Sequence, residues 1–415
     1  MKTALLLAWC CIVAWPPLRA QSEHVWVGSW AASQQIPEPA NAIPREDLRN
    51  ATLRQVVHLS LGGQIIRVHI SNAFGAAPLH IMSVHIARPL SPSSAAIDPA
   101  TDQGLTFHKT NQSIVPAGAE FISDPIEYAV APLSNLAISI YFDEPPTGET
   151  GHPGSRATSY LVHGNFVSAP DLPGARKVDH WYQLSGVDVQ ASSSGRSIVA
   201  LGDSITDGHG ATINGNDRWT DVLARRLQDA STSQNVAVLN AAIGGNHLLT
   251  DGLGPNALAR FDRDVLAQAS VRYLIVLEGV NDLGALARKG DGSSGGHAVV
   301  VQQILAAYEQ IIARGHTHGI KVIGATILPY MGSDYYHPGP IDESDRQSVN
   351  TWIRTPGRFD PVIDFERLTH DPVHPDRLLP AFDSGDHLHP SPAGYAAMGE
   401  AISLSLFSTT LRAEQ

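Results

Sequence analysis

The chain has 415 residues, of which 43% are hydrophobic and 16% charged, and its formal net charge at pH 7 is −12. This length predicts two domains rather than one, and the composition excludes a disordered or fibrous protein. The excess of acidic over basic residues argues against nucleic acid or an anionic membrane surface as a partner.

Residues 1–20 have the pattern of a secretory signal peptide. Lys2 gives a positive start, the apolar segment ALLLAWCCIVAW follows, and we expect cleavage after Ala20. A membrane anchor is disfavoured because the apolar run is shorter than the ~20 residues needed to span a bilayer. A lipoprotein signal ending at Cys10 would have almost no apolar region before it. The sequence therefore predicts a secreted or periplasmic protein with no membrane attachment after cleavage.

Cleavage at that position would change the chemistry open to the mature chain. Both cysteines, Cys10 and Cys11, would be removed, so we expect no disulfide, no thiolate metal site and no cysteine nucleophile. The loss of Lys2 and Arg19 would leave 26 basic and 40 acidic residues, a formal charge of −14.

Residues 24–190 are expected to form an accessory β-domain, a sandwich or jelly roll. Apolar and polar side chains alternate on both sides of Gly62-Gly63, a pattern that predicts a β-hairpin. Exposed aromatic side chains such as Trp26, Trp30 or Tyr160 could bind glycan, but packing inside the domain is the interpretation we favour. The alternating segments are 57–61, 66–70, 82–86 and 136–142.

Residues 195–412 are expected to form a second domain, in which apolar strands alternate with amphipathic helices. This alternation predicts a parallel sheet covered by helices on both faces. In such sheets the ligand site lies beyond the carboxyl ends of the strands. The strands are expected at 197–201, 236–243, 272–279, 321–328 and 361–365, with helices at 218–228, 256–268, 299–315 and 343–354.

The first strand is followed by GDSITDG, residues 202–208, which contains Ser204. A phosphate-binding loop is excluded because it needs a lysine. A calcium loop is excluded because Ile205 fills a ligand position and Asn214 stands where a glutamate belongs. Thr206 breaks the nucleophile motif G-x-S-x-G. Ser204 remains either a nucleophile on a strand-to-helix turn or a simple helix cap.

The second and third strands also end in polar or glycine-rich segments. IGGN, residues 243–246, can present backbone N–H groups to a ligand, although two glycines after a strand are often only a turn. EGVNDLG, residues 278–284, contains Asn281, whose side-chain amide could donate to an anion. Asn-Asp is also common in loops.

The segment DSGDHLHP, residues 383–390, carries two aspartates and two histidines. Asp386 and His389 are three residues apart, so the carboxylate can accept from Nδ1 of the imidazole and leave Nε2 to take a proton. Asp383 should point elsewhere. A metal site built from His387 and His389 requires extended backbone, whereas Pro390 and the expected helix 393–407 indicate a turn. Surface histidines without a role are the third interpretation.

Taken together, these motifs resemble those of the SGNH hydrolases, the GDSL esterase and lipase superfamily. The resemblance implies that Ser204 is the nucleophile, that Asp386 and His389 complete a catalytic triad, and that the N–H groups of Ser204 and Gly245 form the oxyanion hole with Asn281. Gly244 is the alternative to Gly245. The fold implied is a flavodoxin-like three-layer α/β/α domain with a five-stranded parallel sheet. Val280 stands where threonine is frequent in the family, at a position without a catalytic role.

The N-terminal segment WVGSWAASQ, residues 26–34, is similar to the β-rich region of a secreted subgroup, arylesterases and acylhydrolases associated with xylan degradation. The implied function is hydrolysis of carboxylic esters, with short acyl groups such as acetyl on carbohydrates as the leading substrates. A broad-range arylesterase, lipase or polyester hydrolase is the alternative within the same chemistry. A carbohydrate-binding protein with an inactive hydrolase domain is the alternative from another class. The mechanism requires no metal or organic cofactor, and the sequence does not indicate an oligomeric state.

Overall fold

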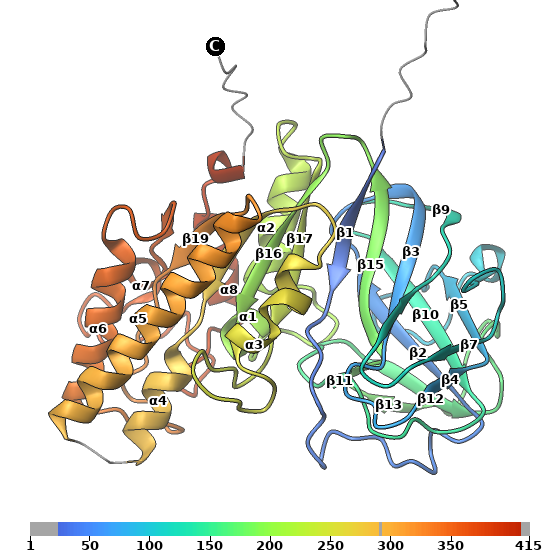
Figure 1. Cartoon of the computed structure of the whole chain (residues 1–415), viewed down its shortest axis with the longest axis horizontal. Coiled ribbons are helices and arrows are strands. Elements are labelled where there is room, and N and C mark those ends of the chain that lie inside the picture. The colour runs from blue at the N-terminus through green and yellow to red at the C-terminus, as the bar shows by residue number, and fades with distance from the viewer. Residues whose placement is uncertain (1–23, 290–292, 408–415) are drawn as a thin grey trace, which may run out of the picture.

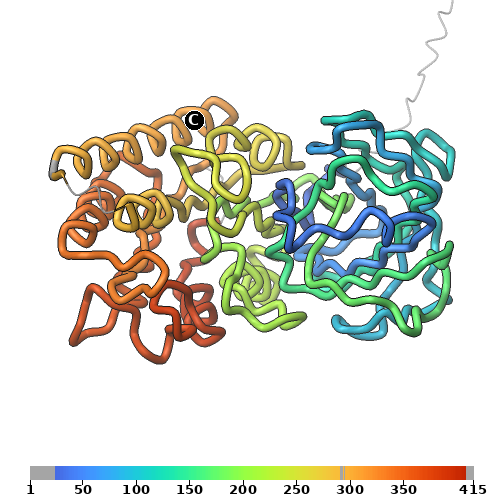
Figure 2. The backbone as a smooth tube through the Cα atoms, turned by 90° about the horizontal axis from the view of Figure 1, so that it is seen from below, coloured from blue at the N-terminus to red at the C-terminus, as the bar shows by residue number. Residues whose placement is uncertain are grey.

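The computed structural model describes residues 24–289 and 293–407 and has two parts, one built on antiparallel and one on parallel sheets (Figure 1). The proposed signal peptide lies outside the described residues, as do residues 408–412 of the second predicted domain. Within the described ranges no helix is both long enough and apolar enough to cross a membrane. Figure 2 shows the two parts side by side, with the blue N-terminal strands at one end and the orange and red helices at the other.

The N-terminal part consists of two main antiparallel sheets that share one apolar core. One sheet has the order β1-β15-β3-β8, with β9 also paired to β3, and the other has the order β13-β12-β2-β10-β5-β6. The elements are β1 (Val25–Ala31), β2 (Ala51–His58), β3 (Gly63–Ser71), β4 (Leu79–Ile81), β5 (Ser83–Ala87), η1 (Pro99–Thr101), β6 (Gln103–Gly104), β7 (Ser113–Val115), β8 (Glu120–Ile122), β9 (Ile126–Val130), β10 (Asn135–Phe142), β11 (Gly151–His152), β12 (Ser159–His163), β13 (Arg176–Val178), β14 (Trp181–Tyr182) and β15 (Leu184–Ala191).

The hairpin predicted across Gly62-Gly63 is wrong. Both strands exist, but β2 pairs with β10 and β12, whereas β3 pairs with β15, β8 and β9. The connection crosses from one sheet to the other, and Leu59 N–H donates to the Ser134 carbonyl at 2.8 Å. A Cβ on Gly62 would lie 2.7 Å from the backbone nitrogen of Pro132, so the glycine permits a close backbone crossing rather than a hairpin turn.

The aromatic residues of the N-terminal part mostly pack inside it. Trp30 is 7% exposed and meets Trp181 edge to face, and Tyr160 is 2% exposed. The guanidinium of Arg67 lies 4.4 Å from the ring centre of Trp26. Trp30 and Tyr160 therefore stabilise the fold and offer no surface on which a sugar could stack.

The C-terminal part is built on a five-stranded parallel sheet of order β17-β16-β18-β19-β20, which is the flavodoxin-like order 2-1-3-4-5. Its helices contact one another in two groups, α2 with α7 and α8, and α3 to α6, as layers on opposite faces of the sheet would. The elements are β16 (Arg196–Gly202), α1 (Ser204–Asp207), α2 (Trp219–Asp229), β17 (Val236–Ala242), α3 (Ala257–Phe261), the π turn η2 (Asp262–Leu266), β18 (Val271–Leu277), α4 (Val280–Lys289), α5 (Ser294–Thr317), β19 (Lys321–Ala325), α6 (Pro340–Arg354), β20 (Val362–Ile363), α7 (Phe365–Thr369), α8 (Pro392–Ala401) and η3 (Leu404–Phe407).

All five predicted strands are confirmed, and the four predicted helices between them coincide with α2, with α3 and η2 together, with α5 and with α6. The helix expected at 393–407 ends earlier, at Ala401, before a short 3-10 turn. Helix α4 was not predicted: the segment EGVNDLG leads directly into it, so Asn281 lies in the first turn of a helix and not in a loop.

The two parts pack tightly along β1 and the edge strand β17. Gly28 N–H donates to the Ala269 carbonyl at 3.2 Å, and Val238 N–H donates to Ser60 Oγ at 3.0 Å. Residues 192–195 alone connect β15 to β16. The boundaries 24–190 and 195–412 stay predictions, but the interface between the parts is continuous with both cores.

One charged cluster in the N-terminal part is partly buried around Asp188, whose side chain is 3% exposed. His69 Nε2 lies 3.0 Å from Asp188 Oδ2, and His69 Nδ1 lies 3.0 Å from Glu120 Oε1. Asp188 also pairs with Arg67 at 2.7 Å. Burial alone would disfavour the imidazolium, but the hydrogen bonds to Asp188 and Glu120 outweigh it and raise the pKa of His69 to about 9.

This cluster predicts a loss of stability in mild alkali. Because the folded-state pKa of His69 lies above its unfolded value of 6.5, its contribution is complete below pH 6.5 and disappears as the pH rises through 9. The loss is at most about 3 kcal/mol. Urea denaturation should show a larger fall in unfolding free energy from pH 6 to pH 9.5 for the native chain than for His69→Gln. The exposed His80→Gln variant should match the native chain, and parallel curves for all three proteins would contradict the assignment.

Candidate active site

Ser204 lies where β16 turns into the one-turn helix α1. Asp203 caps this helix, since its Oδ1 accepts from Ile205 N–H at 2.9 Å, and Gly208 ends it with a φ of 97°. The turn directs Ser204 Oγ toward His389, whose Nε2 lies 2.8 Å away. The carboxyl end of β16 therefore carries the serine, as the parallel sheet predicted.

Asp386 and His389 form the pair that the three-residue spacing suggested. Asp386 Oδ2 lies 2.6 Å from His389 Nδ1, and Asp386 Oδ1 accepts the backbone N–H groups of Leu388 and His389 at 3.0 and 2.9 Å. Burial alone would raise the pKa of Asp386, but these hydrogen bonds dominate and hold that pKa well below its usual range. The carboxylate is therefore ionised at neutral pH and keeps the Nδ1 proton of the imidazole in place.

Asp383 and His387 form a second pair that faces away from the serine. Asp383 Oδ2 lies 2.5 Å from His387 Nδ1, and the His387 side chain is 53% exposed. His387 has a left-handed backbone with a φ of 60°, and its Cβ lies 3.7 Å from the position of a Cβ on Gly332. Each aspartate thus serves one histidine, and only the Asp386–His389 pair reaches Ser204.

The loop after β17 distinguishes its two glycines. Gly244 N–H donates to Asp207 Oδ2 at 3.1 Å and is therefore occupied. Gly245 has a φ of 67°, and neither its N–H nor that of Ser204 has a hydrogen-bond partner among the residues that the structure describes. Two backbone donors remain free beside the serine, and Gly245 rather than Gly244 supplies one of them.

Asn281 is held in the first turn of α4 by contacts at both ends of its amide. Its Nδ2 donates to the Asn246 carbonyl at 2.6 Å, and its Oδ1 accepts from Tyr336 Oη at 2.5 Å. The second N–H of the amide stays available for a ligand. A Cβ on Gly284 would lie 2.5 Å from the Tyr336 ring, so this glycine gives the tyrosine room to reach the amide.

Neither Tyr336 nor Arg260 was identified as a site residue from the sequence, and Arg260 joins the loops beneath the site. Arg260 is 1% exposed and donates to the carbonyls of Gly202 and Ala241 and to Asn246 Oδ1 at 3.1, 2.6 and 2.8 Å. These acceptors lie at the ends of β16 and β17 and in the glycine loop. A lone arginine in an amphipathic helix carries no signal of such a role, because its acceptors come together only on folding.

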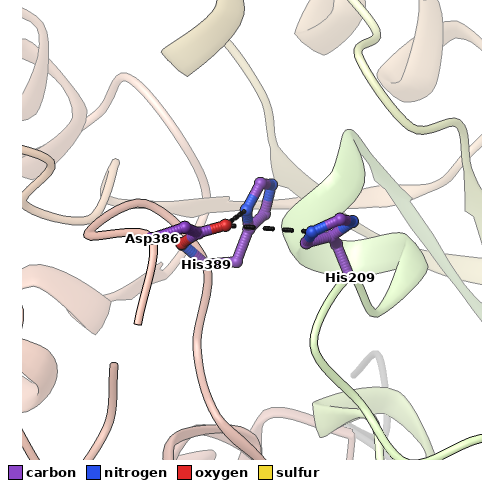
Figure 3. Close-up of side chains that lie close together, drawn as sticks. All are labelled: His209, Asp386 and His389. Carbon is purple, nitrogen blue, oxygen red and sulfur yellow. Dashed lines mark hydrogen bonds and ion pairs between the residues drawn. The ribbon is translucent and has the colours of Figure 1, made fainter. Parts of the chain in front are cut away.

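His209 and Arg156 extend the polar surface beside His389. The rings of His209 and His389 are 4.1 Å apart between centroids, and Figure 3 shows both imidazoles beside Asp386. Arg156 Nη2 lies 3.2 Å from His209 Nδ1. Burial and the neighbouring charges of His389 and Arg156 lower the pKa of His209 to about 4, so this imidazole is neutral at pH 7.

Two groups in the described ranges have ligand atoms close enough to hold a metal ion. The first is His209, Asp386 and His389, whose carboxylate and Nε2 atoms already bond His389 Nδ1 and Ser204 Oγ. The second lies away from the serine, at the starts of α5 and α6, and comprises His297, Asp342 and Asp345. There His297 Nδ1 bonds Asp345, and Asp342 caps α6 through Gly339 N–H.

The family comparison covers the part of the chain that holds this site. Residues 200–397 match the model of the GDSL-like lipase/acylhydrolase family. This segment is a GDSL-like lipase/acylhydrolase domain. Membership implies hydrolysis of esters, and the resemblance seen in the motifs is confirmed at this level. No curated protein matches the chain in sequence.

Among solved structures, the chain is similar to a lipase/acylhydrolase from Enterococcus faecalis, with 23% identity, a TM-score of 0.39, and coverage of 52% of this chain and 100% of that one. The chain is also similar to a catalytic mutant of an acetylxylan esterase from Geobacillus stearothermophilus, with 19% identity and a TM-score of 0.38. That match covers 50% of this chain and 92% of the esterase. A GDSL-like lipase from Bacteroides thetaiotaomicron is similar with 18% identity and a TM-score of 0.37. That match covers 51% of this chain and 88% of the lipase.

The two Asp–His pairs predict opposite effects of mutation. His389→Ala should lower kcat by ~10⁴-fold or more, because no other group is placed to take the Ser204 proton. His387→Ala is the matched control and should keep most of the activity. Steady-state kinetics on p-nitrophenyl acetate would measure both. Loss of turnover in His387→Ala with activity kept in His389→Ala would reverse the assignment.

The contact between Tyr336 and Asn281 predicts a smaller effect. Tyr336→Phe removes the hydroxyl that fixes the amide, so we expect kcat to fall ~10-fold with little change in KM. The neighbouring, exposed Tyr335→Phe should behave as the native chain. A rise in KM at constant kcat in Tyr336→Phe would show that Asn281 binds the ground-state substrate and not the developing oxyanion.

Proposed function

We propose that the chain is a secreted serine esterase that hydrolyses carboxylic esters, in particular short acyl groups such as acetyl on carbohydrates. The observation that carries the proposal is the line of hydrogen bonds from Ser204 Oγ through His389 to Asp386, at 2.8 and 2.6 Å. In this proposal the N-terminal part is a β-sandwich, as its two sheets around one core suggest.

The proposed reaction proceeds through an acyl-enzyme. His389 Nε2 takes the Ser204 proton as Oγ attacks the ester carbonyl, and then returns a proton to the departing alcohol oxygen. A water molecule repeats the attack on the acyl group, giving its proton to His389, and Ser204 regains a proton as the acid leaves. Asp386 stabilises the imidazolium in both halves of the reaction.

The oxyanion would be held by the free N–H groups of Ser204 and Gly245 and by the remaining N–H of Asn281. Donors fixed before the reaction stabilise the negative charge without reorganising. Gly245 owes its availability to Asp207, which occupies the preceding N–H group. Asn281 owes its orientation to Tyr336.

Two features favour a small acyl group on a neutral carbohydrate. The half-exposed Leu253 lies against the proposed oxyanion loop, with its Cγ 3.2 Å from the position of a Cβ on Gly245, and offers a limited apolar contact there. The net charge of −12 disfavours anionic surfaces such as a phospholipid bilayer.

The test is a series of p-nitrophenyl esters from acetate to palmitate, together with acetylated xylan. We expect the highest kcat/KM for acetate and propionate and release of acetate from the polysaccharide. A preference for long chains would instead indicate a lipase, and the absence of turnover on every ester would contradict the function.

A serine-directed fluorophosphonate should label Ser204 and abolish turnover. The reason is that the reagent forms a tetrahedral adduct, which needs both the activated hydroxyl and the oxyanion donors. Peptide mass spectrometry would locate the adduct, and Ser204→Ala should remain unlabelled at an unchanged melting temperature. An adduct on another serine would overturn the assignment of the nucleophile.

A further inference from the structure

A histidine of the N-terminal part reaches the GDSITDG segment of the C-terminal part. His152, in β11, places Nε2 2.9 Å from Asp207 Oδ1 and Nδ1 2.8 Å from the backbone carbonyl of Ser33. The side chains of His152 and Asp207 are 4% and 5% exposed. The ring of Trp181 stacks on that of His152, with ring centroids 5.6 Å apart. Two segments far apart in the sequence thus meet in one buried polar contact.

The partners of His152 define where its protons lie. A backbone carbonyl can only accept, so Nδ1 carries a proton. The contact between Nε2 and the Asp207 carboxyl group is then a hydrogen bond for which one of the two groups supplies the proton. Removal of the imidazole would leave the buried Asp207 carboxyl group without its side-chain partner. Because an unpaired buried carboxyl group is costly, we expect Asp207 to move from its position.

The other oxygen of Asp207 connects this pair to the oxyanion loop. Asp207 Oδ2 accepts Gly244 N–H at 3.1 Å, and Gly245, which has the free N–H, is the next residue. The N-terminal part closes tightly over this carboxylate: a Cβ on Gly154 would lie 1.7 Å from Asp207 Oδ2. Movement of Asp207 would therefore move the loop that carries the oxyanion donor.

Arg218, in the C-terminal part, bonds the backbone of both Asp207 and the loop after β11. Its Nε donates to the Asp207 carbonyl at 2.9 Å, and its Nη2 donates to the Ser155 carbonyl. The loop after β11 therefore lies against the side chain of Asp207 at Gly154 and is joined to the Asp207 backbone through Arg218. Asp207 is positioned from both parts of the chain, and within the described residues only His152 forms a hydrogen bond with its Oδ1.

We propose that His152 is a positioning residue for the esterase reaction: through Asp207 it holds the Gly244–Gly245 loop in the geometry that the oxyanion requires. This inference rests on the proposed function. It makes the N-terminal part an integral half of the active site and not a detachable binding module.

Three substitutions at His152, made in the full chain, separate positioning from packing. His152→Gln keeps an N–H near the position of Nε2 and can still donate to Asp207. His152→Asn keeps an N–H near the position of Nδ1 and can bond only the Ser33 carbonyl. His152→Ala keeps neither contact. His58→Ala is the matched control, because His58 lies in the same part of the chain beside the same interface but bonds only Asn135, at 2.9 Å.

Turnover of p-nitrophenyl acetate should follow the contact with Asp207. We expect His152→Ala and His152→Asn to lower kcat ~10–100-fold with KM changed less than ~2-fold, because a small displacement of the donors affects the transition state more than substrate binding. His152→Gln should recover most of kcat, and His58→Ala should match the native chain. Equal losses in all four variants that follow their melting temperatures, or unchanged kcat in His152→Ala, would overturn the inference.

The rate at which a fluorophosphonate labels Ser204 gives a second readout that does not depend on the ester chosen. It should fall in the same order, since the tetrahedral adduct uses the same donors. If the native chain hydrolyses no ester but Ser204 is labelled, the proposed function fails, and the labelling rates of the variants still decide the role of His152. If labelling does not differ among the variants, His152 has no positioning role.

Discussion

The site depends on a charge buried beneath it. Arg260 occupies the space where β16 and β17 end, and its guanidinium bonds the last carbonyl of β16, the Ala241 carbonyl of β17 and the Asn246 side chain. A buried guanidinium is tolerated only when its donors are satisfied, so the backbone must present these acceptors together. Ser204 and Gly245 follow within a few residues of the acceptors. The position of Ser204 relative to the Gly244–Gly245 loop therefore depends on this cation as well as on Asp207.

The pKa values of the carboxyl groups around Arg260 are shifted in opposite directions. Asp264 lies 3.0 Å from Arg260 and 2.7 Å from Arg263; although burial opposes its charge, the two arginines lower its pKa. Glu278 lies farther from Arg260, at 3.5 Å, and burial together with Asp203 raises its pKa. Burial likewise raises the pKa of Asp203 to about 7. For Asp203 and Glu278 the folded state binds protons more tightly than the unfolded state, so their contribution to stability falls as the pH rises from about 4 toward 7. These two carboxyl groups at the base of the site thus contribute less to stability at neutral pH than at about pH 4.

The sequence predicted which residues line the site but not which residues hold them in place. Strand ends in a parallel sheet share an edge, and this rule alone placed Ser204, the glycine loop and Asn281 together. The spacing of Asp386 and His389 also sufficed, because it depends on a single local turn. The partners of β2 were not predictable in this way: alternation specifies which face of a strand is buried but not which strand lies beside it. Tyr336, Arg260 and His152 likewise act through contacts that exist only after distant segments have folded together.

The segment GDSITDG shows how local and distant constraints combine. Asp203 satisfies an N–H of its own turn, and Ser204 faces His389, so the first half of the segment could be interpreted from its own chemistry. Asp207 ends the same turn, yet its carboxyl group bonds a glycine of the next loop and a histidine of the N-terminal part. One residue five positions after the end of β16 thus links three segments that are far apart in the sequence. If the proposed oxyanion loop is held through Asp207, the N-terminal part cannot vary independently of the active site. The reason is that His152 and Gly154 of the N-terminal part and Gly244 of the loop all pack against the same carboxyl group.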